Sequence, residues 1–524
     1  MPPSALGRPG RSAPVGRHRR TIGTGLILAM VLALLPLGPV VRGEDWETIV
    51  PGIDYRFFNL DGPNRLHAAR LDTREPSVVI ESSLAVGGLA KGFETVSGMA
   101  QRYNGELLAW GDQWGPRGRV VVAINGSSFD PETTQPYGGL FHSGEYARRY
   151  GNLAGGTGFV WTDDREGAIP GCVTHDKARQ LATRLADGET FEIDSVNLLR
   201  DDDGLILFTP QYAAATPHNR NETEAVLQLE APLGIVPPPK YAEAIVLEIR
   251  EGSGETPLYF DQAVLAGQSG AAAFLRQLQP GERIGISQEI TDLGFGCRGN
   301  GGFDWTDVYA GIGGGFVFLR EGEIFVSDDS GEDEPDPRTA ICLDDRYVYF
   351  LVVDGRDDDV SIGMSLDEVA HFCRDELGAT WGLNQDGGGS SAMWVNGRVV
   401  NTPSDGWERP VANGLMMMAV EPPSTSRRFS EGFIVQVQAH GQIRLGPGVN
   451  QPILDVAAPG EELQIAAVAP SLSGVFASGS YWWKVVRKGE LGWIPEQALV
   501  LGEAAISLFQ MPDPPRAVPE SSFP

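Results

Sequence analysis

The spacing of turn-forming residues is the feature that most limits how this 524-residue chain can fold. From Leu66 onward, short apolar runs alternate with turns rich in Gly, Pro and Asp, and Gly alone accounts for 67 residues. Runs of this length suit buried β-strands better than helices. Four of them are predicted strands: residues 119–124, 204–208, 244–249 and 347–353. The sequence therefore predicts an α+β fold, a β-rich mixed sheet with a few helices.

One helix carries both start and stop signals. Ser365 and Glu368 stand at the spacing of a capping box, in which each side chain accepts a hydrogen bond from the other residue's backbone N–H. Gly378 can adopt the left-handed conformation that closes a helix. Between them, apolar residues recur on one helical face: Leu366, Val369, Ala370, Cys373 and Leu377. Residues 347–391 thus read as strand, loop, helix, short strand and glycine loop.

Length and composition divide the chain into two domains and two tails. The chain is longer than one compact core usually organises. A Pro/Ser-rich segment at 421–426 is typical of a linker. We therefore expect a first domain over 44–424 and a small all-β domain over 430–502. Residues 503–524 are Pro-rich, which predicts a disordered tail.

The first 43 residues predict export. They contain six Arg and no acidic residue, whereas the whole chain has a formal charge of -28. Basic residues at 17–20 precede an apolar run from Ile22 to Val41, which is the layout of an export signal. The run is also just long enough to span a bilayer as an N-terminal membrane anchor. Both interpretations stay open, so the protein is expected to be secreted or held at the outer face of the cytoplasmic membrane.

Charge and cysteine spacing exclude two classes of partner. The acidic excess repels phosphates, so we expect no nucleic-acid partner. No Cys-x-x-Cys pair is present, so a zinc site is not indicated. Export would permit disulfides, but three pairings, or free thiols, are compatible with the four cysteines Cys172, Cys297, Cys342 and Cys373.

Three predicted strands end in a polar residue that a glycine closely follows. They open the loops at 125–130, 354–356 and 384–391. Functional residues collect on such loops, because glycine lets a ligand approach backbone N–H groups. The run 387–391 suits an anion such as a phosphate, although it lacks the lysine of a Walker A loop. Arg338 and Arg409 could bind the same anion through two parallel hydrogen bonds, while each alone also fits a surface ion pair.

Taken in order, these loops resemble the phosphodiester glycosidase family. The resemblance spans roughly residues 75–420 and is strongest over 305–416. The segments that carry it are 123–130, 310–315, 337–341, 353–356, 361–365, 384–391 and 408–413. The chain departs from the family pattern at Ser127 and Ser128, at Gln385 and at Cys342. These departures bear on substrate choice more than on the fold.

The resemblance implies a hydrolase that removes a sugar from a sugar-1-phosphodiester, on a cell-envelope or extracellular glycan. Its catalytic candidates are Asp386 and Asp354, with Asp130 third, one of them acting as base or nucleophile. Arg338 and Arg409 would hold the phosphate as charge grows on it. The implied substrate-binding residues are Asn125, Arg338, Thr339, Asn384, Gly387, Gly388, Gly389, Ser390, Ser391, Arg409 and Asn413.

Residues 432–502 resemble a bacterial SH3-like domain, with landmarks at Arg444, Gly446 and 492–494. Such domains often bind cell-wall polymers, although an inert packing module fits equally well. Two alternatives also stay open for the first domain. The main interpretation needs no cofactor, whereas in the first alternative Asp130, Asp354, Asp386 and Asn384 bind Ca²⁺ or Mg²⁺. In the other, the protein binds a cell-wall polysaccharide without catalysis.

Overall fold

The structure is a computed structural model that describes most of residues 42–502. The described ranges are 42–43, 45–104, 117–150, 156–171, 173–199, 204–219, 221–252, 254–292, 304–326, 333–421, 426–449, 451–466, 474–477 and 479–502. The predicted export segment, apart from its last two residues, lies outside these ranges, as do the predicted tail, Cys172 and Cys297. No helix among the described residues is long and apolar enough to cross a membrane.

The largest sheet, which we call the main sheet, has the strand order β1-β3-β4-β24-β23-β25-β21-β22, and β2 pairs with β3. All of these neighbours are antiparallel. Its strands are β1 (Arg42–Gly43), β2 (Glu47–Val50), β3 (Ile53–Leu60), β4 (Asn64–Asp72), β21 (Val317–Arg320), β22 (Glu323–Ile324), β23 (Arg338–Leu343), β24 (Tyr347–Val353) and β25 (Trp381–Asn384).

A second sheet, which we call the facing sheet, has the order β27-β26-β6-β28-β5. Its strands are β5 (Val78–Leu84), β6 (Arg117–Asn125), β26 (Met393–Val395), β27 (Arg398–Val399) and β28 (Asn413–Glu421). Together with α1 (Val96–Tyr103), it packs on one face of the main sheet. The other face is covered by α3 (Leu366–His371).

Alternation along β24 explains how the main sheet is covered on both faces. Val348, Phe350 and Val352 belong to the core shared with the facing sheet. Their neighbours Tyr349, Leu351 and Val353 belong to the core under α3. Successive side chains of a strand point to opposite faces, so a strand apolar at every position must be buried on both.

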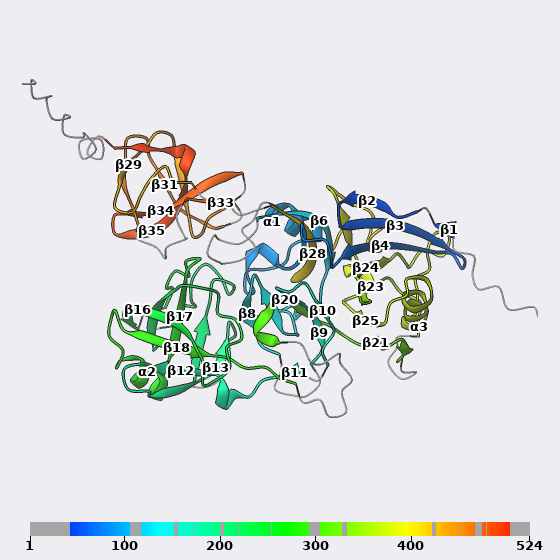
Figure 1. Ribbon diagram of the computed structural model, residues 1–524, viewed down its shortest axis with the longest axis horizontal. Coiled ribbons are helices and arrows are strands. Elements are labelled where there is room, and N and C mark those ends of the chain that lie inside the picture. Colours follow the sequence, from blue (N-terminus) through cyan, green and yellow to red (C-terminus); the bar gives the residue numbers. More distant parts are fainter. Residues whose placement is uncertain are drawn as a thin grey trace, which may run out of the picture. The chain divides into compact units, whose positions relative to one another are not determined.

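A third sheet and a closed barrel lie between β6 and β21 in the chain. The third sheet contains β7 (Leu140–His142), β8 (Glu145–Arg148), β9 (Gly158–Thr162), β10 (Gly167–Ala168) and β20 (Val308–Gly313), and β11 (Val173–Thr174) pairs with β19 (Thr291–Asp292). The barrel, green to cyan in Figure 1, contains β12 (Leu181–Arg184), β13 (Thr190–Val196), β14 (Leu205–Phe208), β15 (Thr223–Leu229), β16 (Ala242–Glu251), β17 (Gln262–Gly267) and β18 (Arg283–Ser287). Its core includes Ala271, Phe274 and Leu275 of α2 (Ser269–Leu275).

The C-terminal strands form one further sheet with its own core, which includes Trp483 and Ile494. Its strands are β29 (Ile434–Val437), β30 (Gly441–Arg444), β31 (Ile453–Ala457), β32 (Glu462–Ile465), β33 (Val475–Ala477), β34 (Ser480–Arg487), β35 (Glu490–Pro495) and β36 (Leu499–Leu501). All its pairs are antiparallel. The likeness to an SH3-like domain stays a prediction, as do the domain boundaries.

The predicted fold class and elements are confirmed. The four predicted strands are β6, β14, β16 and β24. The capping box is present, since Ser365 Oγ accepts from the N–H of Glu368 at 3.2 Å and Glu368 Oε2 accepts from the N–H of Ser365 at 2.8 Å. The helix then continues as a π-helical turn, η4 (Phe372–Glu376), and Gly378 is left-handed with φ of 73°. Short 3₁₀ turns are η1 (Ala85–Gly87), η2 (Lys177–Arg179), η3 (Trp305–Asp307), η5 (Gly388–Ser390) and η6 (Glu496–Ala498).

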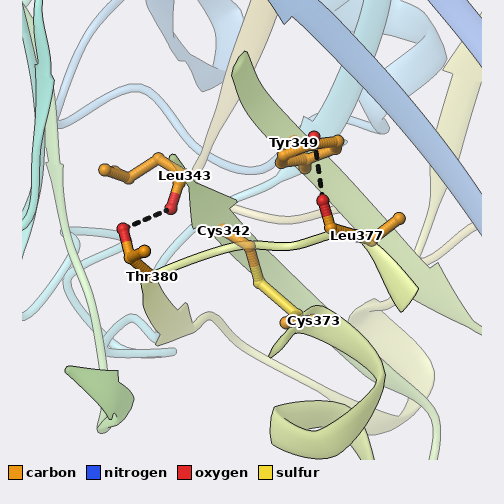
Figure 2. Close-up of a disulfide and its surroundings, with 6 residues drawn as sticks. All are labelled: Cys342, Leu343, Tyr349, Cys373, Leu377 and Thr380. Atoms are coloured by element: carbon orange, nitrogen blue, oxygen red, sulfur yellow. Dashed lines mark hydrogen bonds between the residues drawn. A yellow bond between two sulfur atoms is a disulfide. The ribbon is translucent and has the colours of Figure 1, made fainter. Parts of the chain in front are cut away.

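A disulfide fixes this helix to the main sheet. Cys342 on β23 is bonded to Cys373 in the π-helical turn, and both are buried (Figure 2). Beside it, the hydroxyl of Tyr349 donates to the carbonyl of Leu377 at 3.2 Å. The sequence had left the pairing of the cysteines open, and the structure selects this pair.

Reduction should lower the stability of the protein. The bond closes a loop of 31 residues, so chain entropy predicts a loss of about 3–4 kcal/mol in the free energy of unfolding. Urea denaturation with and without dithiothreitol measures it, in a background where Cys172 and Cys297 are serine. A double variant, Cys342→Ala with Cys373→Ala, should be less stable and should not respond to the reductant. Equal stability of the parent under both conditions would contradict the bond's role.

A buried carboxyl on β8 should make stability depend on pH. Burial raises the pKa of Glu145 from 4.5 to about 7, although hydrogen bonds from Gln211 and Thr209 lower it in part. The folded protein therefore binds more protons than the unfolded chain between these values, and its stability should fall as pH rises through them. Relative to Glu145→Gln, we expect the wild type to lose up to about 3 kcal/mol between pH 4.5 and 7, measured by urea denaturation. A constant difference across this range would contradict the burial effect.

Candidate functional site

The antiparallel order of the strands brings the predicted loops to one place. In the main sheet, Arg338 at the start of β23 lies opposite Val353 at the end of β24. Ala340 of β23 lies opposite Asn384 at the end of β25. In the facing sheet, Gly414 of β28 lies opposite Asn125 at the end of β6. The loops that follow β6, β24 and β25 thus start beside the first residues of β23 and β28.

Asn125 connects the two sheets at this point. It is fully buried, and its Nδ2 donates to the carbonyl of Asp386 at 2.7 Å. Its Oδ1 accepts from the hydroxyl of Thr339 at 2.8 Å and from the N–H of Ala392 at 3.1 Å. The Thr339 hydroxyl also lies 3.2 Å from Ser391 Oγ. We define the glycine loop as residues 386–391. One amide therefore connects β6 and β23 with the first residue of this loop, Asp386, and with Ala392 directly after its last residue.

Asn413 has a similar structural position at the start of β28. It is fully buried, and its Oδ1 accepts from the N–H of Ser127 at 2.8 Å. The carbonyl of Gly126 accepts from the N–H of Asp386 at 3.0 Å, which joins this loop to the glycine loop. A Cβ at Gly126 would lie 2.0 Å from Asn413 Oδ1, so only glycine fits there. Both buried asparagines therefore hold the loops and are not open to a ligand.

Several backbone N–H groups of the glycine loop already donate hydrogen bonds to carbonyl groups of the protein. The N–H of Gly388 donates to the carbonyl of Pro337 at 2.8 Å, and those of Ser390 and Ser391 donate to Gly387 and Gly388. These N–H groups are not available to an anion in this conformation. A bound anion would have to be held mainly by side chains around the loop.

Two half-exposed guanidinium groups occupy the space that a side chain at Gly388 or Gly389 would fill. A Cβ on Gly388 would lie 2.8 Å from Arg356 Nη2, and one on Gly389 would lie 2.0 Å from Arg409 Nη2. Arg356 binds both carboxylate oxygens of Asp336, at 2.7 and 3.1 Å, and this partner, with the charge of Asp405, raises its pKa. Arg409 pairs with Asp405 at 2.8 Å, and its Nη1 lies 3.4 Å from Ser390 Oγ.

The three candidate carboxylates have different surroundings. Asp386 is partly exposed, and its Oδ1 accepts from the hydroxyl of Ser128 at 3.2 Å. Asp354 is buried, with Oδ1 accepting from the N–H of Thr402 at 2.8 Å and Oδ2 lying 3.5 Å from Nε2 of His67. Asp386 is therefore the candidate that a ligand at the loop can reach directly.

Asp130 caps a turn instead. Its Oδ1 accepts from the N–H groups of Glu132 and Thr133, and the first of these bonds lowers its pKa. Nothing among the described contacts connects its carboxylate with the glycine loop.

The alternative with Ca²⁺ or Mg²⁺ also lacks a ligand cluster, since no group of three or more His, Cys, Asp or Glu side chains in the described part of the chain could hold an ion.

Alternation separates Arg338 from the rest of the predicted site. Thr339 faces Asn125, so Arg338 faces the opposite side of the main sheet, with Ala340 and Cys342. Its guanidinium donates to the carbonyl of Met364 at 2.9 Å and to that of Glu334 at 2.7 Å. Asn384 lies on this side too, and its Oδ1 is buried with no hydrogen-bond partner among the described residues. Arg338 thus secures the loops next to α3.

From the sequence, Arg356 is identified only as part of the segment 353–356. Asp336, Asp405 and His67 are not identified from it as residues of the site. The signal for Arg356 was its position two residues after Asp354, in a loop already selected. Asp405 gave no signal, because it pairs with Arg409 across an irregular loop rather than along a helix. His67 gave no signal, because it lies in an ordinary strand far from the loops in sequence.

Comparison with known proteins gives one family match. Residues 257–418 match the family model described as phosphodiester glycosidase. The matched range includes Asp354, Arg356, Asp386 and Arg409, whereas Asn125 precedes it. The resemblance inferred from the motifs is therefore supported over this part of the chain. No match was found among curated proteins.

Three solved structures are similar to the chain. A hypothetical protein from Synechocystis has a TM-score of 0.48 and 18% identity, over 73% of this chain and 64% of that one. A protein from Burkholderia pseudomallei K96243 has a TM-score of 0.47 and 18% identity, over 68% and 74%. The catalytic domain of zebrafish N-acetylglucosamine-1-phosphodiester alpha-N-acetylglucosaminidase has a TM-score of 0.32 and 16% identity, over 73% and 88%.

Replacement of the connecting asparagine should destabilise the protein. Asn125→Ala leaves the Thr339 hydroxyl, the Ala392 N–H and the Asp386 carbonyl without this partner. We expect the free energy of unfolding to fall by about 2–4 kcal/mol, since buried polar groups lose their bonds. Urea denaturation measures it, with Asn59→Ala as the control, because Asn59 is an exposed asparagine on β3. Equal effects of the two substitutions would show that Asn125 does not hold the loops.

Proposed function

We propose that the protein hydrolyses a glycosyl phosphodiester and releases the sugar at its anomeric carbon. The observation that carries this proposal is the placement of Arg356 and Arg409 against Gly388 and Gly389, in the same short loop that carries the partly exposed carboxylate of Asp386. Two guanidinium groups and one carboxylate suit a substrate with an anionic group beside an electrophilic carbon. The family match over 257–418 supports the same reaction class.

In this proposal, the arginines bind the phosphate. The side chains of Arg356 and Arg409 are 48% and 41% exposed, so both can reach a ligand while they keep their aspartate partners. Charge grows on the phosphate as the bond to the sugar breaks, and cations held in place stabilise that state more than the ground state. The departing phosphomonoester is already a stable anion, which lowers the need for a strong general acid.

Asp386 acts as the base or nucleophile at the anomeric carbon. Its backbone is held on both sides, by Gly126 at its N–H and by Asn125 at its carbonyl, so the carboxylate has a defined position. Asp354, buried between Thr402 and His67, is the second carboxylate and positions the loop after β27. The stereochemical course depends on which of the two roles Asp386 takes.

The proposed setting is the cell envelope or the extracellular space. The basic and then apolar layout of the first 43 residues favours export, and the bond between Cys342 and Cys373 suits an oxidising compartment. The C-terminal sheet, if it acts as an SH3-like module, would bind a wall polymer that carries the substrate. A protein that only binds polysaccharide through the same site is the rival to this proposal.

Two substitutions should remove activity without unfolding the protein. Asp386→Asn keeps the size of the side chain but removes the base or nucleophile, and Arg409→Ala removes one phosphate ligand. We expect sugar release from an α-sugar-1-phosphodiester to fall by at least about 100-fold in each, from the usual effect of such groups. Release is measured by chromatography, in a screen that includes a teichoic acid or polysaccharide fraction, and folding by thermal denaturation.

The matched control is Arg346→Ala, which removes an arginine that pairs with Asp72 at the surface. It should keep full activity. Full activity of both Asp386→Asn and Arg409→Ala would sink the proposal, and binding of the substrate without any release would favour the rival. Activity that survives EDTA would argue against the version with a divalent cation.

A further inference from the structure

A histidine of the main sheet lies against the buried carboxylate of the candidate site. His67 is on β4, and Nε2 of its ring lies 3.5 Å from Oδ2 of Asp354. Both side chains are buried. The other ring nitrogen, Nδ1, lies 2.7 Å from the hydroxyl of Tyr55 on β3. We call Tyr55, His67 and Asp354 the polar row.

The register of the strands places the polar row on the face of the main sheet that carries the site. His67 of β4 lies opposite Val352 of β24, and Val352 lies opposite Thr339 of β23. Side chains directly opposite each other on neighbouring strands share one face of a sheet. Asp354 is two residues after Val352 and contacts His67, so it lies on that face too. Thr339, on the same face, bonds to Asn125 of the facing sheet.

One oxygen of Asp354 depends on His67 for a donor. Oδ1 accepts from the N–H of Thr402 at 2.8 Å, whereas Oδ2 is buried and has no hydrogen-bond partner among the described residues. A buried carboxylate oxygen without a donor is unfavourable, and Nε2 of His67 faces this one at ion-pair distance. Hydrogen bonds at functional sites are often long in the absence of a ligand and shorten when it binds.

Only one arrangement of protons suits all members of the polar row. A carboxylate can only accept, so Nε2 must carry a proton to be attracted to Asp354. In the neutral ring Nδ1 then accepts, and the hydroxyl of Tyr55 donates to it. The other tautomer would place the lone pair of Nε2 against Oδ2. Tyr55 therefore favours the tautomer in which His67 can donate to Asp354.

Asp354 in turn holds the start of the segment 402–409, which contains a proposed phosphate ligand, Arg409. The N–H that donates to Asp354 belongs to the first residue of this segment, Thr402. The preceding residue, Asn401, donates from its amide to the last carbonyl of the glycine loop at 3.1 Å. The segment is thus fixed both to the main sheet and to the glycine loop.

We propose that His67 is a positioning residue for the proposed reaction. In the tautomer that Tyr55 selects, it donates to Asp354 and keeps the carboxylate turned toward Thr402, so that the segment 402–409 holds Arg409 against the glycine loop. This inference rests on the proposed function. It adds a residue that lies outside the family match over 257–418.

Two substitutions of His67 separate its two contacts. The amide nitrogen of Gln is as many bonds from the Cα as Nε2, so His67→Gln keeps a donor for Asp354. The amide of Asn reaches only as far as Nδ1, so His67→Asn keeps the contact with Tyr55 and loses the one with Asp354. We expect kcat/KM for sugar release to fall about tenfold in His67→Asn and less than about threefold in His67→Gln.

The matched control is His218→Asn, which removes an exposed histidine that pairs with Glu255 at 3.3 Å. It should leave kcat/KM unchanged, and thermal denaturation checks that each variant is folded. Full activity of His67→Asn, or equal losses in His67→Asn and His67→Gln, would overturn the proposal.

Hydrogen exchange tests the positioning without an assay of activity. In peptides that cover residues 402–409, exchange followed by mass spectrometry should be about tenfold faster in His67→Asn than in the wild type. It should be unchanged in His67→Gln and in His218→Asn. If the wild type releases no sugar from any phosphodiester, the proposed function fails and exchange decides this inference. Equal exchange in His67→Asn and in the wild type would then overturn it.

The tautomer provides a spectroscopic test on the full chain. With histidines labelled with nitrogen-15, NMR at about pH 8.5, where an ordinary imidazole is neutral, should show His67 with its proton on Nε2. The signal is assigned by its loss in His67→Gln. Tyr55→Phe should lower the share of this tautomer, and an unchanged share would remove Tyr55 from the proposal. A wild-type ring with its proton on Nδ1 would overturn the proposal, because Nε2 could not donate to Asp354.

Discussion

The buried amide of Asn125 is the interaction on which the position of the candidate site depends. Its three hydrogen bonds end on Thr339 of β23, on the first residue of the glycine loop and on Ala392 directly after that loop, while its backbone belongs to β6. Burial makes these bonds mutually dependent, because any one that is lost leaves a polar group without water. The side chain of Asn125 therefore holds the main sheet, the facing sheet and the glycine loop in one geometry, although it cannot itself contact a ligand.

Two glycines of this loop determine where the positive charges of the candidate site can lie. Gly388 and Gly389 have no Cβ, and the space that a Cβ would fill is occupied by Arg356 and Arg409. The arginines approach the loop closely while ion pairs with aspartates orient them. Glycine thus contributes less through free N–H groups, several of which are already bonded, than through the room it leaves for cations.

The sequence predicted what local chemistry determines. Strands with short apolar runs and the helix after Ser365 follow from patterning and capping, and the structure has them. The loops at strand ends were also found, because polar residues beside glycine mark them. Arg338 shows the limit: its neighbour Thr339 faces the site, and only the assembled sheet shows that the arginine faces the opposite side and bonds to carbonyls. Closure of the barrel and the partner of Cys342 depend likewise on contacts between distant segments.

The crowding at the glycines restricts how this site can change as the gene mutates. An alanine at Gly126, Gly388 or Gly389 would collide with Asn413, Arg356 or Arg409. Gln385 is different, because both polar atoms of its buried amide lack a hydrogen-bond partner among the described residues. Substitution next to the glycine loop is therefore easier at Gln385, whose side-chain polar atoms hold no described group in place. A lineage could exchange Gln385 for an apolar residue of similar size without loss of any contact made by the arginines or by Asn125.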